Sequence, residues 1–380
     1  MTTIVLLIAL SLVGLVVASW LHYVYWVKRL TLDVSYELVE RLITADGCMV
    51  ELRRLPRDHA LEGHALEGHA PEGHAPEGPP VLLVHGLALN HRNNDMTEDL
   101  SLGRYLSRAG RDVWLLTLRS GRDDLSWGEE RRATFEVMAR HDLRTGIDEV
   151  LKRTGESELD YVGFSMGGML MYAAAGRTIA DERLRRVVLI GSPARVQPPL
   201  AMLSVVARFV PGWLVPTLRL RIVSRFMAFA ADLIHTPIHR WIYNAENVEP
   251  GVAGYALVNG FVSIPSGLAS ELVRFASDDG NVTFDGESVL PSLRGVTVPA
   301  LFVAGADDRL APPTAVQLAY DAWGADVGTA KDFRVIGIDT GAAADYGHGD
   351  LAIGRFADQD VFEPVHAFLA ADVLVDHAAE

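Results

Sequence analysis

A serine between two glycines is the residue of this chain best suited to act as a nucleophile. Residues 163–167 read Gly-Phe-Ser-Met-Gly, which fits the pattern G-x-S-x-G. They fall between an expected strand and an expected helix, the setting in which this pattern presents a reactive serine. Gly163 and Gly167 leave room for the adjoining backbone, and a helix beginning beside Ser165 favours developing negative charge. A plain tight turn is the alternative interpretation of the motif.

A serine hydroxyl is a weak nucleophile and needs a neighbouring base. For a serine in a strand–turn–helix setting, the acid and the histidine follow later in the chain, in that order. Asp308 follows an expected strand at residues 298–304, and His348 follows another at 334–338. His348 would take the proton of Ser165 and return it to the leaving group, while Asp308 would hold the imidazole tautomer.

Other residues compete for these two roles. Asp307 is an alternative acid. Asp350 lies only two positions from His348 and is poorly placed to orient its ring, so we expect it to make structural hydrogen bonds. The remaining candidate bases lie in a helix (His141), in the tail (His377), in a long insertion (His235 and His239) and in a loop that we expect to be shaped by its histidine (His85).

A tetrahedral intermediate carries an oxyanion, which needs two N–H donors that are already in place. The backbone amide of Met166, directly after the serine, is one expected donor. The second should come from the loop after the first central strand, residues 85–88, and we assign it to Leu87.

The elements around these residues alternate between strand and helix. This alternation predicts the α/β class, with a mostly parallel sheet and helices on both of its faces. An Asp-Gly pair at Asp46 and Gly47 predicts a hairpin that precedes the alternating part. The expected strands are 36–43, 48–55, 81–84, 113–118, 159–164, 187–190, 298–304 and 334–338, and the expected helices are 100–109, 135–154, 166–175, 313–323 and 361–369.

Taken in order, several motifs resemble the α/β-hydrolase superfamily, and within it the acid lipase branch of gastric and lysosomal type. The matching pieces are residues 44–47, 80–87, 110–115, 134–143, 161–167 and 346–351. The resemblance implies an α/β-hydrolase fold and a serine carboxylic-ester hydrolase that works through an acyl-enzyme beneath a cap. An acyltransferase with the same triad and a non-catalytic binding protein of the same fold remain alternatives. Dehalogenases and epoxide hydrolases are disfavoured, because they use an aspartate where this chain has Ser165.

The expected pattern is interrupted by residues 193–297, here called the insertion, which separate two parts of the core, 30–192 and 298–380. We expect the insertion to form a helical cap. Apolar helices that carry arginine can lie in a membrane interface, or they can cover an acyl pocket with the arginines solvated. Both interpretations suit a small-molecule or lipid ester as substrate. Six arginines stand against one acid, Asp232, between residues 195 and 241: Arg195, Arg208, Arg219, Arg221, Arg225 and Arg240.

The N-terminal segment, residues 1–29, is expected to be a transmembrane anchor. Residues 4–26 carry no formal charge and reach about 34 Å as a helix, enough to cross a hydrocarbon core. Lys28 and Arg29 follow directly, which predicts a single pass with the catalytic domain in the cytoplasm. A cleaved signal peptide is the alternative, although the segment has no basic n-region.

Composition narrows the remaining function classes. The chain has 34 basic and 49 acidic residues, a net charge of −15, so it offers no overall basic face for nucleic acid. A single cysteine, Cys48, excludes an intrachain disulfide. We expect no metal and no cofactor, because no phosphate loop, zinc-spaced cluster or dinucleotide motif stands out. Four pentapeptides that begin with histidine lie in residues 58–80, and their glycines and prolines favour a flexible loop over a metal site.

Overall fold

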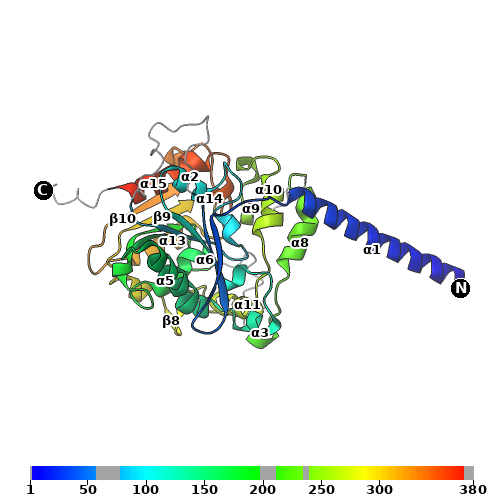
Figure 1. Cartoon of the computed structure of the whole chain (residues 1–380), viewed down its shortest axis with the longest axis horizontal. Coiled ribbons are helices and arrows are strands. Elements are labelled where there is room, and N and C mark those ends of the chain that lie inside the picture. The colour runs from blue at the N-terminus through cyan, green and yellow to red at the C-terminus, as the bar shows by residue number, and fades with distance from the viewer. Residues whose placement is uncertain (1, 57–77, 197–210, 234–238, 372–380) are drawn as a thin grey trace.

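The computed structural model describes residues 2–56, 78–196, 211–233 and 239–371 (Figure 1). An eight-stranded sheet in the order β1-β2-β4-β3-β5-β6-β9-β10 runs through the body. β1 pairs antiparallel with β2 and β2 antiparallel with β4, and the other neighbours are parallel, which confirms the expected fold class. The strands are β1 (Leu38–Ile43), β2 (Met49–Arg54), β3 (Val81–Val84), β4 (Val113–Thr117), β5 (Leu159–Phe164), β6 (Leu184–Ile190), β9 (Ala300–Gly305) and β10 (Lys331–Ile336).

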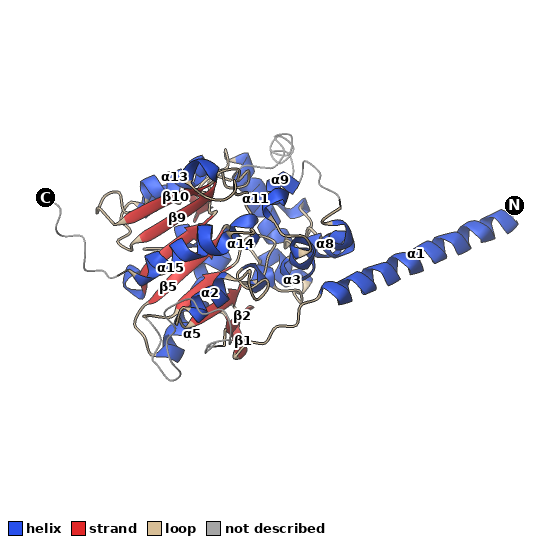
Figure 2. Ribbon diagram, turned by 90° about the horizontal axis from the view of Figure 1, so that it is seen from above, coloured by secondary structure: helices blue, strands red, loops and turns tan. Residues whose placement is uncertain are grey.

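Helices cover both faces of the sheet (Figures 1 and 2). One face packs on α5 (Leu143–Thr154), α6 (Met166–Ala174) and α13 (Pro313–Ala322). The other packs on α2 (Leu102–Arg108) and α15 (Glu363–Ala370). The central strands are apolar on both sides because each side is buried, as in β3, where all four residues are inaccessible.

The expected helix at 135–154 is a composite of three segments. It begins as α4 (Phe135–Val137), widens into a π-helical turn, η3 (Met138–Asp142), and continues as α5. The last expected helix similarly starts with a π-helical turn, η10 (Asp358–Phe362), before α15.

The remaining elements are short and lie in the connections between these strands and helices. The helical ones are η1 (His91–Asn93), η2 (Arg119–Gly121), α3 (Trp127–Arg132), η4 (Asp181–Arg183), η5 (Gly212–Leu214), α8 (Leu220–Met227), η6 (Ala228–Ala230), α9 (His239–Ile242), η7 (Ala245–Asn247), α10 (Val252–Tyr255), η8 (Ala256–Gly260), α11 (Ser266–Ser277), α12 (Leu290–Leu293), η9 (Ile338–Thr340) and α14 (Asp350–Ile353), and a small hairpin pairs β7 (Thr283–Phe284) with β8 (Glu287–Ser288).

The insertion packs in two ways. Its second part, from α11 to α12, contributes Phe275, Phe284 and Leu293 to the main core beneath the sheet. Its first part, α8 to η8, has a smaller apolar cluster in which Tyr243 and Val252 pack with Met96 and Ile353 of the body. The role of the insertion as a cap, with boundaries at 193 and 297, stays a prediction.

Helix α1 (Thr2–Leu30) projects from the body as a long rod (Figures 1 and 2). Residues Ile4–Leu30 are long and apolar enough to cross a membrane, with a mean hydropathy of 2.7 in an 18-residue window, although a signal sequence would meet the same criterion. Near its C-terminal end α1 packs on the insertion, where the ring of His22 lies 4.5 Å from that of Phe229 and 5.7 Å from that of Phe226. The histidine repeat up to residue 77, and Arg208, His235 and His377, lie outside the described residues.

Candidate active site

Ser165 occupies a sharp turn between β5 and α6. Its φ and ψ are 51° and −115°, a conformation that residues with a side chain rarely adopt. Its backbone N–H donates to the carbonyl of Ile190 at the end of the neighbouring β6, at 2.7 Å. Strain of this kind persists only where the surrounding structure imposes it, and it is concentrated at functional sites.

The two glycines of this turn are required by close backbone approach. A Cβ at Gly163 would lie 2.5 Å from the backbone nitrogen of Gly168, and one at Gly167 would lie 2.5 Å from the carbonyl oxygen of Val84. Both clashes are with main chain, which cannot move aside cheaply. The sheet therefore fixes the turn, here called the elbow (residues 163–167).

The structure brings the Ser165, His348 and Asp308 side chains together at the carboxyl edge of the sheet. His348 Nε2 lies 2.9 Å from Ser165 Oγ, and its Nδ1 lies 2.8 Å from Asp308 Oδ2. Asp308 is 3% exposed and His348 is 9% exposed. Because a carboxylate accepts the Nδ1 proton, Nε2 is left as an acceptor for the serine hydroxyl. The arrangement can move a proton from Ser165 to the imidazole.

The other oxygen of Asp308 is held by the backbone. Oδ1 accepts from the amides of Leu310, at 2.9 Å, and Ala311, at 2.7 Å. The neighbouring candidate, Asp307, instead faces Arg309 at 3.5 Å on the surface. The structure thus places Asp308, rather than Asp307, beside the imidazole.

Asp350 has a structural environment beneath the histidine loop. Its side chain is inaccessible to solvent and accepts from the amide of Gly347, the amide of Asn244 and the Nδ2 group of Asn247, each at 3.0 Å. Burial raises the pKa of its carboxyl. Asn244 and Asn247 belong to the insertion, so Asp350 connects the insertion to the loop that carries His348. Sequence reasoning missed both asparagines.

The amide of Leu87, in the loop after β3, is free to face a reacting group. Gly86 N donates to Asn93 Oδ1 at 3.0 Å, whereas the Leu87 N–H has no hydrogen-bond acceptor within the described part of the chain. Met166 is the first residue of α6, where amides have no partner within the helix. The chain after Leu87 is strained, with φ of 57° at Ala88. These features suit the expected pair of donors, which stays a prediction.

His85 shapes this loop, as its position in the sequence indicated. It lies 2.8 Å from the carbonyl of Gly86 through Nδ1 and accepts from the amide of Leu118 at Nε2, 3.1 Å away. Complete burial lowers its pKa to about 4. The ring is therefore neutral at pH 7, with its proton on Nδ1.

The insertion also holds the loop after β3. The amide of Val262 donates to the carbonyl of Ala88 at 2.8 Å, and the amide of Asn90 donates to the carbonyl of Gly260 at 3.1 Å. Asn90 Nδ2 donates to the carbonyl of Asn259 at 2.9 Å. Sequence reasoning passed over these residues, although the polar run from Asn90 to Asn94 was a visible signal.

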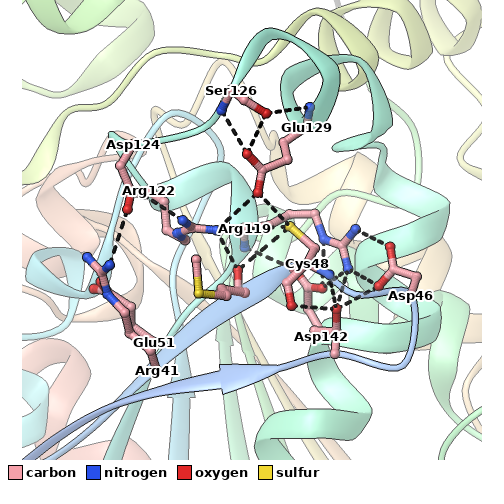
Figure 3. Close-up of polar contacts among 12 residues, drawn as sticks. Arg41, Asp46, Cys48, Glu51, Arg119, Arg122, Asp124, Ser126, Glu129 and Asp142 are labelled. Carbon is pink, nitrogen blue, oxygen red and sulfur yellow. Dashed lines mark hydrogen bonds and ion pairs between the residues drawn. The ribbon is translucent and has the colours of Figure 1, made fainter.

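An ion-pair network centred on Arg119 joins two of the sequence motifs that lie far apart in the chain, residues 44–47 and 134–143 (Figure 3). Arg119, 1% exposed, donates to both oxygens of Asp46, at 2.6 and 2.8 Å, and through Nε to Asp142 at 2.8 Å. These bonds hold the β1–β2 turn, the segment after β4 and the turn η3 together. Cys48 lies beside the network, and burial raises the pKa of its thiol, which disfavours a thiolate.

No group of three or more His, Cys, Asp and Glu side chains in the described ranges could hold a metal ion. The expectation that the protein needs no cofactor stays a prediction.

Comparison with known proteins gives a consistent family. The model of the alpha/beta hydrolase fold matches residues 79–342. The chain is similar to gastric triacylglycerol lipase of Bos taurus, 32% identical over 159 residues, which are 38% of this chain and 36% of that protein. It is 30% identical over 147 residues to the human lysosomal acid lipase/cholesteryl ester hydrolase, covering 34% of this chain and 32% of that one. The chain thus spans only about two fifths or less of the length of these relatives.

Two solved structures resemble nearly the whole chain. An enol-lactonase from Burkholderia xenovorans has a TM-score of 0.52 at 17% identity, covering 87% of this chain and all of that one. A membrane phospholipase A described as a bacterial virulence factor has a TM-score of 0.51 at 15% identity, covering 96% of each chain. At such low identity these likenesses show the fold alone.

Proposed function

This chain belongs to the alpha/beta hydrolase fold family, and from that premise we propose that it is a carboxylic-ester hydrolase acting through Ser165. The observation that carries the proposal is the contact of Ser165 Oγ with His348 Nε2 at 2.9 Å, with Asp308 on the other ring nitrogen. The partly matching lipases, named above, support an ester as the substrate.

The reaction proceeds in two halves. His348 takes the Ser165 proton as Oγ attacks the ester carbonyl, and the amides of Leu87 and Met166 hold the oxyanion that forms. His348 then gives the proton to the departing alcohol, which leaves an acyl group on Ser165. In the second half a water gives a proton to His348 and attacks the acyl carbon, so the acid is released and the serine hydroxyl is restored.

Ser165→Ala tests this function. We expect turnover of p-nitrophenyl butyrate to fall by about 10⁴-fold or more, and labelling by a fluorophosphonate probe to disappear. Ser292→Ala is the matched control, because that hydroxyl donates to a carbonyl of its own turn in α12. A wild-type protein that neither turns over the ester nor reacts with the probe would contradict the proposal.

We further propose that α1 anchors the protein in a membrane and that α8 faces the same bilayer. The apolar side of α8 and its flanks is solvent-accessible next to α1, with Ile222 and Val223 each 60% exposed and Leu233 77% exposed. Two arginines at the start of α8 form ion pairs, which differs from the interfacial interpretation of the insertion's arginines. Arg219 pairs with Glu130 at 2.7 Å, and Arg221 pairs with Asp123, because acids of the α3 region lie within their reach. The exposed apolar residues therefore carry this proposal, and they suit a lipid ester.

Quenching by lipid-attached nitroxides measures this contact. A fluorophore on Ile222→Cys in nanodisc-embedded protein should be quenched strongly, whereas the same label on Leu318→Cys, an exposed position of α13, should not. The native Cys48 is buried and gives little background. Equal quenching at the two positions would refute the proposed orientation of α8.

The cytoplasmic orientation rests on Lys28 and Arg29, which follow the apolar run. A relative named for the lysosome lends it no support. Membrane-impermeant labelling of Leu318→Cys in intact cells decides the question, since a cytoplasmic body would be labelled only after permeabilisation.

A further inference from the structure

We infer that Asn259 is a positioning residue that ties the end of α1 to the loop carrying the proposed Leu87 donor. The inference rests on the proposed function and adds to it a mechanical link between the anchor and the oxyanion site. Asn259 is the fourth residue of the π-helical turn η8 in the insertion.

The side chain of Asn259 grips the chain where α1 ends. Its Nδ2 donates to the carbonyl of Leu30 at 2.8 Å and to that of Tyr255 at 2.9 Å, while its Oδ1 accepts from the amide of Leu32 at 3.0 Å. The last carbonyls of a helix have no partner within the helix. Asn259 thus satisfies one of them and also fixes the first residues that follow.

The main chain of the same segment grips the loop after β3. The carbonyl of Asn259 accepts from Asn90 Nδ2 at 2.9 Å, and the carbonyl of Gly260 accepts from the Asn90 amide at 3.1 Å. Leu89 and Phe261 form an antiparallel bridge, and the Val262 amide reaches the carbonyl of Ala88. Asn259 therefore contacts the anchor through its side chain and the loop through its backbone.

The loop needs such support because its backbone is strained. Ala88 has φ of 57°, directly after the residue whose amide is proposed to face the oxyanion, and a conformation of this kind relaxes unless its surroundings hold it. A shift of about 1 Å in a catalytic group can lower the rate about 100-fold. Strand β3 precedes Leu87 in the chain, and the bonds from residues 259–262 hold Ala88 and Asn90, which follow it.

The supporting turn is itself braced from α8. Ser224 Oγ donates to the carbonyl of Leu257 at 3.0 Å, and Arg225 Nε donates to that of Val258 at 3.1 Å. A π-helical turn inside a helix is rare and is often found at functional sites. Here it places Asn259 so that side chain and carbonyl point to two different partners, the anchor and the loop.

Kinetics of the full-length protein in detergent micelles tests the inference. With p-nitrophenyl butyrate, Asn259→Ala should lower kcat about 10- to 100-fold and leave KM within about twofold, because an oxyanion donor acts in the transition state. The pH profile of kcat/KM should keep its shape, since the His348–Asp308 pair is untouched.

A second variant separates positioning from folding. Asn90→Asp keeps the side-chain oxygen that caps η1 by accepting from Arg92 N but removes the donor to the Asn259 carbonyl. It should reduce kcat in the same way, and the double variant should be no slower than the slower single one, because both act on one link. Gln317→Ala on α13, where the side chain donates to Asp321 one turn later, serves as the control with unchanged kinetics.

Each outcome bears on the inference. A lowered melting temperature with wild-type kcat and KM in Asn259→Ala or Asn90→Asp would mean a purely structural role and overturn it. A raised KM with unchanged kcat would assign the segment to substrate binding and also overturn it. If wild-type protein shows no turnover at all, the proposed ester hydrolysis fails instead, so the two failures are distinguishable.

Discussion

The elbow and the two loops beside it are held by different parts of the molecule. The elbow is built into the sheet, with Gly163 and Gly167 pressed against backbone and Ser165 bonded to β6. The loops with Leu87 and His348 are instead bonded to the insertion, through residues 259–262 and through Asp350. The nucleophile is therefore held by the core, while the loops that carry Leu87 and His348 depend on contacts with the insertion.

This difference predicts which changes lower activity most and which modulate it. Changes to the core around the elbow should cause the largest loss of activity. Changes to the contacts with the insertion should lower the rate and leave the nucleophile in place. The four predictions below test this division in order of expected effect.

Gly167→Ala should have the largest effect. A methyl group there would meet the Val84 carbonyl oxygen at 2.5 Å, so the elbow must shift, and we expect kcat to fall by about 100-fold or more. Steady-state kinetics with p-nitrophenyl butyrate measures it. Gly295→Ala, where a Cβ would meet no atom within 4 Å, should match the wild type. An active Gly167→Ala protein would show that the core does not fix the elbow.

Asp350→Ala should lower kcat about tenfold and reduce the free energy of unfolding by about 3 kcal/mol, because three donors, two of them in buried hydrogen bonds, lose their acceptor. Kinetics and urea denaturation measure the two effects. Asp326→Ala, which removes an exposed partner of Arg294, should change neither by much. Unchanged kinetics in Asp350→Ala would mean that the insertion does not position His348.

Asp46→Asn should destabilise the protein by about 3 kcal/mol at pH 7. Its kcat should stay close to wild type, since the Asp46 side chain bonds to Thr44 and Arg119 and not to the elbow. Hydrogen bonds from Arg119 lower the pKa of Asp46. The stability that Asp46 contributes is therefore present above its unfolded pKa of about 4 and is lost as the pH falls further. Denaturation at pH 7 and pH 3 should show the difference from wild type shrinking; a constant difference would contradict this origin.

Glu271→Gln should have the smallest effect, a change of about 1–2 kcal/mol in the free energy of unfolding. Burial raises the pKa of Glu271 to about 7, and its carboxyl accepts from the amide of Phe135, which links α11 to the core. Wild-type protein gains stability from this group below pH 4.5 and loses it as the pH rises through 7. The variant should lose less stability between pH 4.5 and 8 in thermal unfolding; an unaltered pH dependence would exclude Glu271 as the cause.

Local patterns sufficed to predict the core of the fold. Buried apolar runs such as residues 81–84, the Asp-Gly turn and the elbow motif each reflect a short-range requirement that is visible in a few neighbouring residues. The convergence of Ser165, Asp308 and His348 was predictable because parallel strands end at one edge.

The insertion was less predictable because its contacts are long-range and polar. The bonds of Asn259 to Leu30 and Leu32 span more than 200 positions, and those of Asn244 and Asn247 to Asp350 span more than 100. An asparagine has no periodicity that would indicate its partner. The π-helical turns likewise lack a sequence signature that separates them from ordinary helix.

Hydrogen bonds fix the chain at the junction between α1 and the body. The carbonyl of Leu30 and the amide of Leu32 are both bonded to one side chain, so the rod cannot swivel freely about its end. In a bilayer crossed by α1, the body would not move freely relative to the membrane. The carboxyl edge of the sheet, with the proposed active site, would lie at a fixed height and tilt. Molecules presented at another depth would then have to travel to that level before they could react.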